Sequence, residues 1–119
     1  PGRPTLLLGV MADKDVPGML APLSRSAALA SARIITTRIA NARALPAGDL
    51  AASCEQLLSR SGRPRPHVVA LEPVEAALQA ALAASSREDG PLVVAGSLYL
   101  AGEVRRRLVH DPGLRDPPV

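Results

Sequence analysis

The residue best suited to bind a charged ligand is Lys14, the only lysine among the 14 basic residues of this 119-residue chain. It lies between Asp13 and Asp15 in the segment GVMADKD (9–15), where an apolar run ends and a helical pattern begins. Asp15 is placed to cap that helix, because a carboxylate accepts from the free amides of the first turn. A lysine is disfavoured there, so its charge is offset either by the two aspartates or by an anionic ligand. The residues alone leave both interpretations of Lys14 open.

A second candidate is Ser97, which follows Gly96 at the end of the apolar run PLVVAG (91–96). Its hydroxyl and the free backbone amides at the start of the next helix could hold a carboxylate or a phosphate. A serine that only caps this helix explains the pattern equally well.

Familiar catalytic and metal-binding motifs are missing from the sequence, which has no GxxxxGK[ST], GxGxxG, CxxC or HExxH segment. The single cysteine, Cys54, lies inside an apolar helical stripe and is expected to be a core residue. His67 begins a predicted strand and His110 ends a predicted helix, so neither is well placed to act as a base. We therefore expect no catalytic residue and no metal site in this chain.

Four short apolar runs, each followed by a segment with helical spacing, position these residues. The predicted strands are residues 5–11, 33–37, 67–71 and 91–96, each buried on both faces. The inward faces predicted for the four helices are Val16, Met19, Leu20 and Leu23; Leu50, Cys54, Leu57 and Leu58; Val74, Ala77, Leu78, Ala81 and Leu82; Leu100, Ala101, Val104 and Leu108. This alternation predicts an α/β fold of three layers, a mostly parallel sheet with helices on both faces. Ligands of such sheets bind at the carboxyl ends of the strands, where Lys14 and Ser97 lie.

The domain predicted by this pattern covers residues 1–110, and residues 111–119 are expected to form an irregular tail. Four strands are few for a parallel sheet of this kind. We therefore expect at least one further element of the fold to precede Pro1.

The composition argues against two classes of partner. The net charge is +3, but Tyr99 is the single aromatic residue, so no basic run is interleaved with aromatics and we expect no nucleic-acid binding. No apolar stretch approaches the ~18 residues of a membrane span. One cysteine allows no internal disulfide, and a cytoplasmic protein is the expectation that fits best.

Three segments, in this order and spacing, resemble the C-terminal domain of the folylpolyglutamate synthase and dihydrofolate synthase family of the Mur ligase superfamily. They are LLLGVMADKDVPGML (6–20), TTRIANARALPAGDLA (36–51) and LVVAGSLYLAGEVR (92–105). Enzymes of this family add L-glutamate to a folate or to dihydropteroate, using ATP and magnesium to form an acyl phosphate that the glutamate amine attacks. The resemblance implies the Rossmann-like fold of that domain and, for the parent protein, a ligase function in folate biosynthesis and one-carbon metabolism.

The resemblance also implies roles for individual residues. The lysine that matches Lys14 and the serine that matches Ser97 contact the carboxylate of the incoming L-glutamate. Asp13 and Arg43 are possible supporting residues, and Arg43 is interpreted as a structural arginine of its loop. ATP and Mg²⁺ would be held mainly by an N-terminal ATPase domain whose motifs this sequence does not contain. We therefore expect the chain alone to bind no cofactor tightly and to be inactive as a ligase.

A function of another class also fits the residues. The chain could be a stand-alone α/β module that binds a small anion or a partner and has no ligase activity. A phosphate-binding loop in the reading frame upstream is required by the ligase interpretation and is not expected by this alternative.

Overall fold

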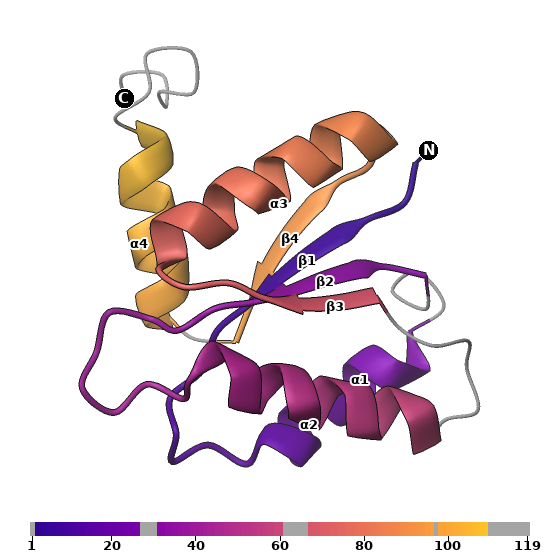
Figure 1. The fold of residues 1–119 in the computed structure, drawn as a ribbon, viewed down its shortest axis with the longest axis vertical. Coiled ribbons are helices and arrows are strands. Elements are labelled where there is room, and N and C mark those ends of the chain that lie inside the picture. The colour runs from indigo at the N-terminus through magenta and orange to yellow at the C-terminus, as the bar shows by residue number, and fades with distance from the viewer. Residues whose placement is uncertain (1, 27–30, 61–66, 97, 110–119) are drawn as a thin grey trace.

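The structure is a computed structural model that describes residues 2–26, 31–60, 67–96 and 98–109. Strands and helices alternate along the described chain (Figure 1). The elements are β1 (Thr5–Leu8), α1 (Val16–Arg25), β2 (Arg33–Thr36), α2 (Ala47–Arg60), β3 (His67–Ala70), α3 (Val74–Glu88), β4 (Leu92–Ala95) and α4 (Leu98–Val109). All four predicted strands are confirmed, although each ends before its predicted last residue. The predicted tail, residues 111–119, lies outside the described residues.

The four strands form one sheet in the order β3-β2-β1-β4, and every neighbouring pair is parallel. The strands are in register, so that Leu7 of β1 lies opposite Ile35 of β2 and Val94 of β4. β1 is therefore an inner strand with a neighbour on each side. The chain moves from β1 outward to β2 and β3, and then returns past β1 to place β4 on the other side.

Helices cover both faces of this sheet, with α1 and α2 on one face and α3 and α4 on the other (Figure 1). Side chains of β1 alternate between the two layers, because successive residues of a strand point to opposite faces. Leu6 and Leu8 pack with α1 and α2, whereas Leu7 packs with α3 and α4. The prediction of a three-layer α/β fold with a parallel sheet is confirmed.

The prediction that every strand is buried on both faces is wrong for the two outer strands of the sheet, β3 and β4, since Val93 of β4 is 37% accessible and no residue of β4 is fully buried. His67, Val69 and Ala70 are exposed, and Val69 is 40% accessible. β3 lies at the edge of the sheet and pairs only with β2, so it lacks the cover that neighbours give to β1. All four residues of β1 are buried.

The predicted inward faces of the helices are mostly buried in the part of the chain that is described, and Cys54 is 2% exposed as expected of a core cysteine. Two of the predicted core positions are wrong, because Leu82 is 37% exposed and Ala101 is also exposed. Each directly follows a buried residue, Ala81 or Leu100, and one residue turns a helix by about 100°. Both side chains therefore point away from the core.

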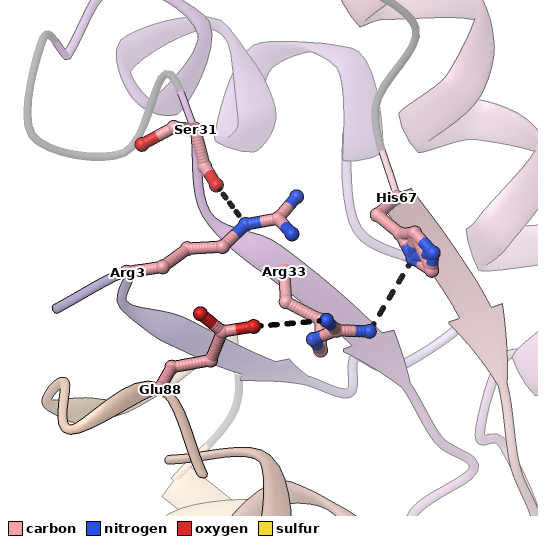
Figure 2. A network of polar contacts seen from close by, with 5 residues as sticks. All are labelled: Arg3, Ser31, Arg33, His67 and Glu88. Atoms are coloured by element: carbon pink, nitrogen blue, oxygen red, sulfur yellow. Dashed lines mark hydrogen bonds and ion pairs between the residues drawn. The ribbon is translucent and has the colours of Figure 1, made fainter.

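A polar network joins several elements at the amino ends of the strands (Figure 2). Arg33 of β2 donates through Nη2 to Oε1 of Glu88 at the end of α3, at 3.2 Å, and through Nη1 to Nδ1 of His67 at 3.5 Å. Arg3 donates through Nε to the backbone carbonyl of Ser31. The contacts of Arg33 join β2 to β3 and to α3. They lie at the amino ends of the strands, whereas Lys14 follows a carboxyl end.

Candidate functional site

The segment that carries Lys14 leaves the carboxyl end of β1 and leads into α1. Asp15 accepts a hydrogen bond through Oδ1 from the amide of Gly18, at 3.2 Å, so the predicted helix cap is confirmed. A Cβ on residue 18 would lie 2.3 Å from Oδ2 of Asp15, so a larger residue there would have to displace the capping carboxylate. The carboxylate of Asp15 is thus directed at its own helix.

The loop between β2 and α2 packs against this segment through its backbone. The amide of Ala12 donates to the carbonyl of Arg43 at 2.7 Å, and the amide of Leu45 donates to the carbonyl of Val10 at 3.0 Å. Met11 and Ala44 form an isolated antiparallel bridge between the same two segments. The loop that contains Arg43 therefore holds residues 10–12 in place through backbone contacts.

The Arg43 side chain also contacts a neighbour of Lys14. Its Nη1 lies 3.9 Å from Oδ2 of Asp13, and both side chains are largely exposed, so this ion pair contributes little to stability. It nevertheless brings together two of the predicted supporting residues from separate loops. Asp13 is paired with Arg43 in the structure and not with Lys14.

Lys14 makes no ion pair with either flanking aspartate in the described part of the chain. Of its two flanking aspartates, Asp15 caps α1 and Asp13 pairs with Arg43. Lys14 is exposed, and within the described ranges no ion pair is made by its ammonium group. An exposed point charge of this kind is free to meet an anion.

The chain after β4 begins directly beside the chain after β1. Gly96 has a φ of +113°, and a Cβ at this position would lie 2.4 Å from the carbonyl oxygen of Gly9. Only glycine permits this backbone conformation and this approach. Ser97, the second predicted carboxylate ligand, follows Gly96 but lies outside the described residues.

The strand order gives these two loops a special position. The connections turn outward from β1 to β2 on one side and reach β4 on the other, so the direction of winding reverses between β1 and β4. Ligands of open α/β sheets bind in the crevice at such a reversal, beyond the carboxyl ends of the strands. Lys14 and Gly96 both follow the strands that border this point. The apolar pattern locates the strands but not their order in the sheet, because strand order depends on contacts between distant segments.

Glu72 has a role that the sequence did not reveal. It follows β3, and its Oε2 accepts a hydrogen bond from the amide of Ala47 at 2.9 Å. This places a carboxylate at the N-terminus of α2, where it complements the free amides and the helix dipole. The two residues are 25 positions apart, and no local motif signals such a contact.

The described residues contain no reactive thiol and no cluster of metal ligands. Burial, and secondarily the charge of Glu55, raises the pKa of Cys54 from 9.0 to about 12, so its thiol is protonated and unreactive near neutral pH. No group of three His, Cys, Asp or Glu side chains in the described ranges is arranged to hold a metal ion. The described residues therefore offer no cluster of donors that fits Mg²⁺.

The structure is a parallel α/β domain in which the exposed Lys14 follows β1, one of the two strands between which the strand order reverses direction. Two solved structures share this fold. A folylpolyglutamate synthase from Mycobacterium tuberculosis in complex with ADP and AMPPCP matches 98% of this chain with a TM-score of 0.66 and 22% identity. A structure of the M. tuberculosis enzyme with ADP matches 98% of the chain with a TM-score of 0.63 and 23% identity.

These matches confirm the predicted fold, that of one part of a folylpolyglutamate synthase. The chain spans about a quarter of the length of those proteins, 24% of the first and 25% of the second. No family model and no curated protein matches the sequence. None of the helices in the described ranges is both long and apolar enough to cross a membrane.

Proposed function

We propose that this chain is the substrate-binding and closing domain of an ATP-dependent ligase that adds L-glutamate to folates, to dihydropteroate, or to both. The observation that carries the proposal is Lys14, an exposed cation whose two neighbouring carboxylates are used elsewhere. It lies on a fold shared with folylpolyglutamate synthase, and it follows the strand where ligands of such sheets bind. A cytoplasmic location belongs to the same proposal.

In this proposal Lys14 attracts and orients the carboxylate of the incoming L-glutamate. Arg43 belongs to the loop whose backbone contacts hold residues 10–12, and its exposed side chain pairs with Asp13. Ser97 would add a directed hydroxyl next to the free amides at the start of α4. ATP and Mg²⁺, which supply the activation of the acyl group, would be held mainly by another domain of the parent protein. Closure of the two domains would then bring the bound glutamate to the activated acyl group. On this proposal the chain alone carries out no ligation.

The decisive experiment is Lys14→Ala in the full-length parent enzyme. Loss of a charge-assisted contact costs about 1.5–3 kcal/mol, so the KM for L-glutamate should rise roughly 10- to 100-fold. The KM for ATP should stay near its original value, because the lysine is not assigned to the nucleotide. Steady-state kinetics with each substrate varied in turn measures both quantities.

A matched control is Arg106→Ala, which removes an exposed cation from α4 without touching the loop of Lys14. It should leave both KM values unchanged. An unaltered KM for glutamate in the Lys14 variant would refute the assignment.

A further inference from the structure

The outer strand β4 has one side that no described strand occupies. β4 pairs only with β1. The carbonyl of Ala95 accepts from the amide of Gly9, so the backbone groups of alternate residues of β4 turn toward β1. The amides and carbonyls of Leu92 and Val94 therefore turn to the open side. Such a row of backbone groups is a template for pairing with a further strand.

One face of β4 is uncovered as well. Val93 lies in register with Leu6, so its side chain points to the face that carries α1 and α2. The Val93 side chain is nevertheless exposed, with 37% of its surface accessible. On the opposite face Leu92 and Val94 pack against the core that includes residues of α3 and α4. Within the described residues, β4 thus lacks a strand on one side and a helix on one face.

The crossovers already present show on which face a further helix would lie. The chain moves from β1 to β2 and on to β3 with α1 and α2 on one face, and it returns from β3 to β4 with α3 on the other (Figure 1). This arrangement follows from the right-handed rule for parallel crossovers. A connection from a strand outside β4 inward to β1 moves in the same direction as β1 to β2. Its helix must therefore lie on the face of α1 and α2, where Val93 is exposed.

A strand added outside β3 fits less well. Its connection to β1 would run in the opposite direction, so its helix would have to cross β3 and β2 on the face of α3. That position is occupied, because Ala77, Leu78 and Ala81 of α3 pack there against Leu7 and Ile35. Only the side of β4 offers both an open strand and an uncovered face for the connecting helix.

The beginning of the described chain lies where such a helix would end. The amide of Gly2 donates to the carbonyl of Asp89 at 3.0 Å, in the turn just before β4. A helix that runs over β4 from the carboxyl ends of the strands to their amino ends would reach β1 from here by a short connection. The chain covers only 24% of the first matched structure, so a parent protein of that length has residues to supply the unit.

We propose that β4 is a docking surface for a strand–helix unit of the parent polypeptide, encoded before residue 1. The added strand lies parallel to β4 and pairs with the backbone groups of Leu92 and Val94. The apolar face of the helix that follows it covers Val93. β4 then becomes an inner strand, as β1 already is. This inference concerns how the sheet is completed, and it does not depend on the ligand of Lys14.

The test of the helix uses the parent protein, expressed from its full reading frame. Val93→Cys and Val69→Cys place a thiol at two valines of similar exposure in this structure, 37% on β4 and 40% on β3. A thiol reagent should label position 93 at least about tenfold more slowly than position 69, because the added helix buries only the first. The unsubstituted protein gives the background of the other thiols, to which the buried, protonated Cys54 adds little.

Hydrogen exchange tests the added strand in the unsubstituted parent protein. The amide of Leu71 donates to β2, so the amides of Val68 and Ala70 turn to the open side of β3 and serve as the reference. The amides of Leu92 and Val94 should exchange at least about tenfold more slowly than these two. Equal labelling of the two thiols, or equal exchange of the two pairs of amides, overturns the proposal. A reading frame that encodes no strand and helix before residue 1 overturns it as well.

Discussion

Asp13, Lys14 and Asp15 are consecutive charged residues whose side chains differ in their contacts. Asp15 caps α1, Asp13 pairs with Arg43, and Lys14 has no acidic partner within the described residues. The cap was predictable, because it depends on residues only three positions apart. The pairing of Asp13 was not, because it depends on how a loop 30 residues further along the chain folds back. The residues alone leave the role of Lys14 open, and the tertiary contact adds only that Asp13 has a second cationic neighbour in Arg43.

Cys54 gives a prediction at the residue scale that depends on pH. Its pKa is raised by burial to about 12, so the folded chain keeps a proton that the unfolded chain releases above about pH 9. The stability that the folded chain gains by keeping the Cys54 thiol protonated is fully present below pH 9 and is lost as the pH rises toward 12. From pH 9 to pH 10.5 the free energy of unfolding should fall by about 2 kcal/mol more in the native chain than in Cys54→Ala. Urea unfolding at several pH values measures this difference, and parallel curves for the two proteins would contradict it.

Some features of the helices and strands are determined by their local sequence, and others depend on contacts with distant segments. The periodicity of apolar residues located all four strands and most buried helical positions, because it reflects local geometry. It could not show that β3 is an edge strand, because strand order depends on contacts between distant segments. It also could not show that the start of α2 is capped by Glu72 from the loop after β3. Of the candidate site, the loop positions were predictable and their grouping beside the reversal in winding was not.

The cap of α2 gives a prediction at the scale of the element. Glu72→Ala removes the acceptor of the Ala47 amide and a negative charge from the helix N-terminus, so stability should fall by about 1 kcal/mol. The Ala47 amide should also exchange with solvent faster, which hydrogen-exchange NMR detects at this single residue. The control is Glu55→Ala, an exposed glutamate in the middle of the same helix, which should leave that amide unchanged. Equal exchange in the Glu72 variant and the native chain would show that the cap is unimportant.

At the scale of the whole molecule, the amino ends and the carboxyl ends of the parallel strands carry different side chains. At the carboxyl ends Lys14 is exposed, while Asp15 and Glu72 cap helices. At the amino ends Arg33 contacts both Glu88 and His67 (Figure 2). Stabilising contacts are thus present at both ends, and those of Arg33 lie away from Lys14.

The ion pair of Arg33 and Glu88 gives a prediction at the scale of the whole molecule, because it joins β2 to α3. This partly buried pair should show a coupling free energy of about 1 kcal/mol in a double-mutant cycle of Arg33→Ala and Glu88→Ala, measured by urea unfolding. A coupling near zero would mean that the contact contributes no stability.

The central position of β1 has a consequence for synthesis on the ribosome. Translation completes β2 soon after β1, but the other neighbour, β4, is made only when residues 92–95 emerge. Until then one edge of a fully buried strand has no partner, and Leu100, which helps to cover it, does not yet exist. An unpaired strand edge of this kind invites pairing with other chains. The core around β1 can therefore close only after β4 and α4 have been synthesised. During that interval the nascent polypeptide is most exposed to misassembly and to binding by chaperones.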